Sequence, residues 1–98
     1  MSIEAATRER DAAIKAAEAT RDLQEKALAE NVRKAMEDMK TAADIKALEA
    51  GAAAERQRII AEEKVAVERA EAKLREQREM EAKNIEWTQR QNEPPKDK

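Results

Sequence analysis

Glycine and proline, the residues that most often interrupt helices, are almost absent from this chain of 98 residues. The only glycine is Gly51, and the two prolines stand together as Pro94 and Pro95. Most other positions hold Ala, Glu, Lys, Arg or Gln, which favour helices because they lose little rotamer freedom there. The sequence therefore predicts an all-α protein.

The two ends of the chain carry helix start and stop signals. Ser2 can cap an amino terminus, because its hydroxyl can accept from a free backbone N–H. Pro94 excludes the α conformation from the residue before it. We therefore expect one continuous amphipathic helix over residues 1–92, strongest over 28–87, and a disordered, proline-terminated tail over 93–98. Such a helix would be about 135 Å long.

Two alternatives would break this helix. Gly51 lies near the middle of the chain, where it costs about 1 kcal/mol relative to Ala, and a turn near it would give a helical hairpin. Thr41 and Asp44 have the spacing of a capping box, in which Thr41 would begin a new helix. The alanines around Gly51 offer no turn chemistry, so a continuous helix remains the main expectation.

The apolar residues are too small to form a compact core. Hydrophobic residues make up 41% of the chain, but 22 of them are Ala, whereas Leu, Ile, Val and Phe together number only 13. Chains this poor in large apolar residues cannot bury enough surface on their own. A long helix also needs a partner for its apolar face. We therefore expect a coiled coil or helical bundle with other chains.

The spacing of the apolar residues suggests where that partner would bind. One stripe advances by four, four and three residues, a repeat of eleven that gives a nearly straight seam. It comprises Leu28, Val32, Met36, Met39, Ala43, Ala47, Ala50, Ala54, Ala61 and Val65. A second stripe, displaced around the helix, comprises Ile45, Leu48, Ala52 and Ile59.

The candidate interface residues are the larger members of these stripes and a few residues beyond them. Trp87, the only aromatic residue, either closes the end of a bundle by packing on Ile85, Met80 or a neighbouring chain, or anchors the chain in a partner's pocket. The predicted interface is Leu28, Val32, Met36, Met39, Ile45, Leu48, Ile59, Val65, Val67, Leu74, Ile85 and Trp87.

Composition disfavours most kinds of chemistry. The chain has no His and no Cys, and therefore lacks an imidazole base, a thiolate nucleophile and the usual zinc ligands. Catalytic carboxylates need burial or a close like charge to shift their pKa values, whereas carboxylates along a helical rod stay solvated. We expect no catalytic residues, no metal, no cofactor and no small-molecule substrate.

The charges point to a solvated helix surface. Lys and Arg number 20 and Asp and Glu 22, and the two signs are interleaved, with acid–base pairs four residues apart such as Glu30 with Lys34 and Glu86 with Arg90. Interleaved acids weaken the positive field that a protein needs to bind nucleic acids or membrane surfaces, so we expect neither as a partner. With neither a signal peptide nor an apolar run long enough to span a membrane, we expect the protein in the cytoplasm or in an assembled particle.

Residues 53–75 resemble in composition the Ala-, Glu- and Arg-rich helices of the peripheral stalks of rotary ATPases, which also use spacings near eleven. A small, helical, Cys-free chain is similar as well to phage scaffolding and internal virion proteins. These resemblances imply an elongated structural component, but we assign the chain to no family.

Taken together, these features predict a structural, non-enzymatic coiled-coil protein. It would act as a scaffold, spacer or connector, associating with copies of itself or with other proteins of a larger assembly such as a virion. An alternative is a conditionally folded, protective or chaperone-like protein that is disordered alone and becomes helical on drying or on binding a client.

Overall fold

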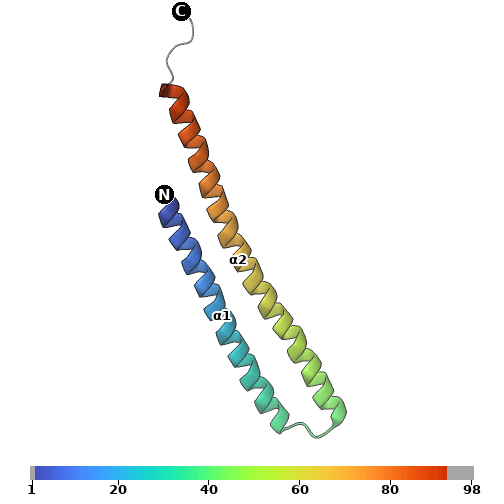
Figure 1. Ribbon diagram of the computed structural model, residues 1–98. Coiled ribbons are helices and arrows are strands. Elements are labelled where there is room, and N and C mark those ends of the chain that lie inside the picture. The colour runs from blue at the N-terminus through green and yellow to red at the C-terminus, as the bar shows by residue number, and fades with distance from the viewer. Residues whose placement is uncertain (1, 93–98) are drawn as a thin grey trace, which may run out of the picture.

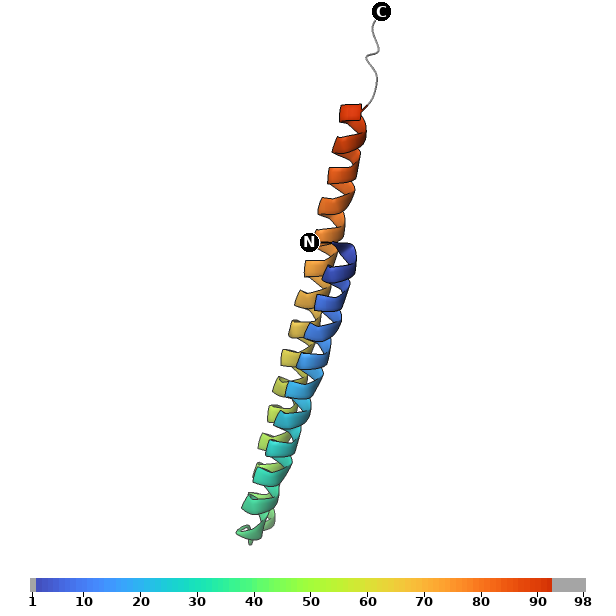
Figure 2. The ribbon, with the colours of Figure 1, turned by 90° about the vertical axis from the view of Figure 1, so that its left-hand side faces the viewer.

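The protein is a helical hairpin. The computed structural model describes residues 2–92, which form α1 (Ile3–Glu37) and α2 (Ala42–Asn92). The two helices lie side by side along the whole of α1, and α2 continues past the amino terminus of α1 (Figures 1 and 2). The expected all-α fold is therefore confirmed. The tail expected over 93–98 lies outside the described residues.

The expectation of one continuous helix is wrong, because the chain turns back at residues 38–41. The N–H groups of Asp38 and Met39 each bond to a carbonyl three residues earlier, at 3.2 Å, which tightens the end of α1. Thr41 Oγ1 then accepts from Asp44 N–H at 3.1 Å and caps α2. Asp and Thr side chains compete with helical hydrogen bonds, and a cap of this kind is worth about 1 kcal/mol.

The alternative turn near Gly51 is also wrong. Gly51 lies inside α2, and no described residue has a positive φ. A Cβ built at Gly51 would meet no other atom within 4 Å. The residue therefore costs the helix some intrinsic stability without being needed for a turn or a close approach.

The helices meet along a line of side chains, here called the seam. Its members recur at intervals of three and four residues and are the buried and half-buried positions of each helix. In the middle and lower parts of α1 they are Ile14, Ala17, Arg21, Gln24, Leu28, Val32 and Ala35, followed by Met39 in the turn, and in α2 they are Ile45, Leu48, Ala52, Glu55, Ile59, Glu63, Val67, Ala70, Leu74, Gln77 and Glu81.

In α2 the eleven-residue stripe lies on the face that points away from α1. Its α1 members Leu28 and Val32 are half-buried, but Ala43, Ala47, Ala50, Ala54, Ala61 and Val65 are all exposed. The turn resets the helical phase, so α2 presents the displaced stripe of Ile45, Leu48, Ala52 and Ile59 to α1. The buried residues among those described are Ala6, Ala52, Ile59, Ala70 and Leu74.

The amino end of α1 is capped as the sequence predicts. Ser2 Oγ accepts from Ala5 N–H at 3.1 Å, and Glu4 lies in the first turn, beside the positive end of the helix dipole. This cap fixes where α1 begins, and therefore how much of α2 it covers.

Candidate functional site

The predicted interface residues divide into two groups in the hairpin. Ile59 and Leu74 are buried, whereas Leu28, Val32, Met39, Ile45, Leu48 and Val67 are half-buried, and all eight lie along the seam. These side chains therefore contribute to packing between two helices of one chain. Whether any of them also contacts another chain stays a prediction.

The other four predicted interface residues, Met36, Val65, Ile85 and Trp87, remain exposed. Trp87 exposes 63% of its surface, so neither Ile85 nor Met80 covers it within the hairpin. The predicted interface did not include three further exposed apolar side chains, Leu23, Ile60 and Met80. Their positions off the seam become evident only once the hairpin fixes which face of each helix is covered.

The upper end of α2 has no helix beside it. Lys73 Nζ lies 2.7 Å from Glu9 Oε1 across the two helices, so α1, which begins at Ile3, ends only a few residues further up α2. We call residues 81–92 the overhang, which extends α2 by about 18 Å beyond α1. Figure 1 shows this single helix above the amino terminus.

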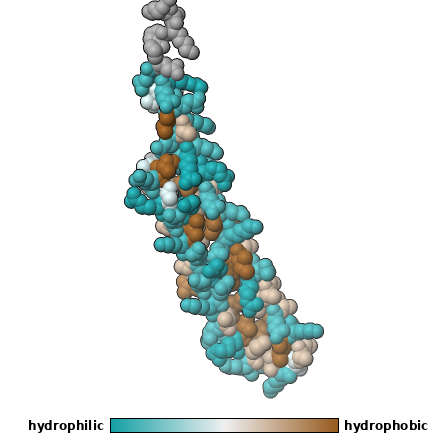
Figure 3. Space-filling view, in the orientation of Figure 1, coloured by the Kyte–Doolittle hydropathy of each residue, from teal (hydrophilic) through white to brown (hydrophobic). Residues whose placement is uncertain are grey.

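The overhang, together with Met80 directly before it, carries the most concentrated apolar surface outside the seam. Met80, Ile85 and Trp87 are 59%, 52% and 63% exposed. A shallow groove there is lined by Gln77, Met80, Glu81, Asn84, Ile85, Thr88 and Gln89. Figure 3 shows hydrophobic surface recurring on α2 above the level at which α1 begins. This end is the strongest candidate for contact with another molecule.

A charged pair lies within the seam itself. Arg21 Nη1 is 2.8 Å from Glu63 Oε2 and donates to Glu63 Oε1 at 3.1 Å, while Arg21 Nη2 donates to Asp22 at 3.0 Å. Hydrogen bonding to Asp22 and the nearby charge of Glu63 raise the Arg21 pKa above its ordinary value. Arg21 Nε is buried without a hydrogen-bond partner. A polar pair at a seam position favours one alignment of the two helices over others.

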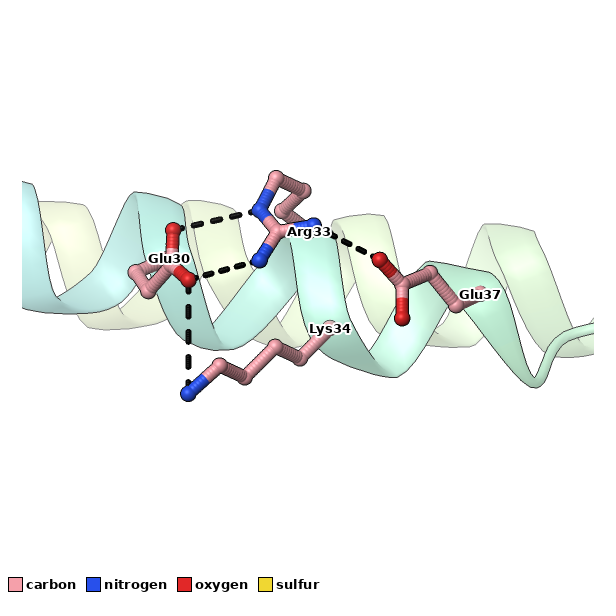
Figure 4. Close-up of polar contacts among 4 residues, drawn as sticks. All are labelled: Glu30, Arg33, Lys34 and Glu37. Atoms are coloured by element: carbon pink, nitrogen blue, oxygen red, sulfur yellow. Dashed lines mark hydrogen bonds and ion pairs between the residues drawn. The ribbon is translucent and has the colours of Figure 1, made fainter.

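Ion pairs within each helix lie on the solvent faces or, at Glu55, at the edge of the seam. Arg33 donates to Glu30 at 2.7 Å and 3.1 Å and to Glu37 at 2.6 Å, and Lys34 approaches Glu30 at 4.0 Å (Figure 4). The hydrogen bonds from Arg33 lower the pKa of Glu30. Arg58 likewise pairs with Glu55 and Glu62 and lowers the pKa of Glu55. These groups are solvated, and they stabilise the surface of each helix.

Comparison with known protein families, curated proteins and solved structures found no match to the chain. Within residues 2–92, neither helix has a stretch long and apolar enough to cross a membrane.

Proposed function

We propose that the chain is a non-enzymatic structural protein that serves as a stiff spacer or connector within a larger assembly. The observation that carries the proposal is the shape of the molecule. The chain measures 91 × 20 × 8 Å between its outermost Cα atoms, and α2 alone, with 51 residues, is about 76 Å long. α1, with 35 residues, packs along about two thirds of that length and stiffens it, and this is what a spacer requires.

The exposed surface supports the assembly part of the proposal. The accessible surface is 7971 Å², whereas a compact monomer of 11.1 kDa has about 5,700 Å². The excess follows from the elongated shape, which leaves much of both helices uncovered. Among residues 2–92, seven large apolar side chains are exposed, including Leu23 and Met36 on α1 and Ile60 and Val65 on α2.

Circular dichroism and small-angle X-ray scattering of the isolated chain test the proposal. A stiff spacer gives a strongly helical spectrum, a cooperative thermal transition and the scattering of a thin rod. A coil spectrum at every accessible concentration would overturn the proposal, and would favour the conditionally folded protective protein instead.

A further inference from the structure

The seam continues along α2 beyond the point where α1 begins. Its α2 positions alternate intervals of three and four residues from Val67 through Ala70, Leu74 and Gln77 to Glu81, and all five are buried or half-buried. The same intervals lead on to Asn84, Thr88 and Gln91, which are exposed. The spacing of these positions is the same on both sides of Glu81, and what changes is that α1 no longer covers them. The overhang therefore presents the continuation of a face that another helix already occupies lower down.

Apolar side chains flank this continued face on both sides. Met80 and Trp87 are seven residues apart, so they lie one above the other on one flank. Ile85 directly follows Asn84 and lies on the opposite flank. The ion pair between Glu86 and Arg90, with an N–O distance of 2.8 Å, lies on the far side of the helix. The overhang is thus amphipathic, with its charged pair turned away from the face that α1 leaves uncovered.

We infer that the overhangs of two copies of this chain pair with each other in antiparallel orientation, about a two-fold axis near Glu86. This inference rests on the proposed function and names one partner of the assembly. α1 runs antiparallel to α2. The α2 of a second copy, paired antiparallel with the overhang, therefore runs in the same direction as α1 and takes the place that a longer α1 would occupy. The partner's overhang then occupies the groove lined by Asn84, Ile85 and Thr88.

The available length and the helical repeat together select one register. The partner's last helical residues reach only to the start of α1, so the pairing is centred within 81–92. Keeping the seam positions face to face then places Asn84 of each copy opposite Thr88 of the other, and Glu81 opposite Gln91. At the axis the two Trp87 side chains meet on one flank and the two Ile85 side chains on the other. The register therefore buries both large apolar residues of the overhang.

Two further features favour a second copy over an unrelated helix. A two-fold interface needs a surface that is complementary to itself, and this register brings no like charges face to face. It also places the negative carboxyl end of each α2 near the positive amino end of the partner's α1. The contact is small, with polar residues at its centre, so the dimer is weak, concentration-dependent and specific in alignment.

Sedimentation equilibrium of the full chain, together with the fluorescence of its only aromatic residue, tests whether the dimer forms. Raising the concentration should produce a dimer and shift the emission of Trp87 to shorter wavelength. I85E should raise the concentration needed for dimerisation by about tenfold or more, because it places a charge at the centre of the contact. V65E changes a residue that is 43% exposed on α2 outside the overhang, and should leave dimerisation unchanged.

Spin labels on single introduced cysteines test the register, since the chain has no Cys of its own. A label at position 83 lies close to the axis, and its partner's label should be within about 25 Å. Labels at position 69 should be about 50 Å apart, twice their distance from the axis.

Three results would overturn the inference. They are a chain that stays monomeric at millimolar concentration, a Trp87 emission that does not depend on concentration, and a short distance between the two labels at position 69. The second result is the one expected if residues 93–98 of the same chain cover Trp87. A folded rod with any of these results would leave the proposed function standing, whereas a coil would remove both.

Discussion

Arg21 and Glu63, separated by 42 positions in the chain, form an ion pair across the seam, with Arg21 Nη1 2.8 Å from Glu63 Oε2. The pair joins the middle of α1 to α2, and the residues around it include both apolar side chains, such as Ile59, and polar ones, such as Gln24. Arg21 also holds Asp22, so its guanidinium is fixed from two sides. We therefore expect the Arg21–Glu63 pair to favour this alignment of the two helices.

Reversing one charge of this pair should destabilise the hairpin. E63R places two arginines together in the seam and should lower the thermal midpoint, and R21E should do the same with two carboxylates. The combined R21E/E63R chain should recover part of the loss, although Asp22 will then repel the carboxylate introduced at position 21. E68K, at an exposed position, is the matched control and should change little. If the double variant is no more stable than either single one, the contact does not fix the alignment.

Two adjacent isoleucines provide a direct comparison of buried and exposed positions. Ile59 is 2% exposed and Ile60 is 45% exposed. I59A should cost about 2–5 kcal/mol of unfolding free energy, since it removes buried methylenes and leaves a cavity. I60A should cost less than about 1 kcal/mol, partly because Ala is the better helix former. Urea unfolding measures both, and equal losses would mean that the seam runs elsewhere.

The sequence was sufficient to predict helices and the Ser2 cap, because those depend on local propensity. It also contained both signals for the hairpin, the Thr41 cap and the displaced stripe of Ile45, Leu48, Ala52 and Ile59. Neither signal could be weighed without knowing that α1 and α2 bury each other's faces. In the sequence, Arg21 and Glu63 have no feature that separates them from surface charges. Their pairing could not be predicted, because it depends on how two segments distant in sequence are aligned by the turn.

Replacing the single glycine should stabilise the protein. Gly51 lies within α2, and a Cβ there meets no atom within 4 Å. G51A should therefore raise the free energy of unfolding by about 0.5–1 kcal/mol, because it gains helix propensity without a clash. G51P should lose about 3 kcal/mol or more, as expected for proline in a helix interior. A destabilising G51A would indicate a bend at this position.

Acid should weaken the hairpin through its surface ion pairs. Hydrogen bonds from Arg33 and Arg58 lower the pKa values of Glu30 and Glu55 below the ordinary value of 4.5. The unfolded chain therefore binds protons more readily, and the stabilisation present above pH 4.5 is lost as pH falls through the lower, folded pKa values. Thermal midpoints should decrease between about pH 6 and about pH 2.

The combined variant E30Q/E55Q removes these two titrating groups and provides the control. Its midpoint should be lower than that of the parent at neutral pH, and it should fall less on acidification. Equal acid sensitivity in the two proteins would assign the effect to other carboxylates.

The central claim is that one chain folds back on itself at residues 38–41, and an intramolecular distance tests it most directly. Thr20 on α1 and Ala66 on α2 line the same shallow pocket between the helices. Spin labels on T20C/A66C, measured in a large excess of unlabelled chain, should lie within about 20 Å of each other. A continuous helix would place the same two positions about 69 Å apart. The short distance is the result predicted by the hairpin, and the long one would contradict it.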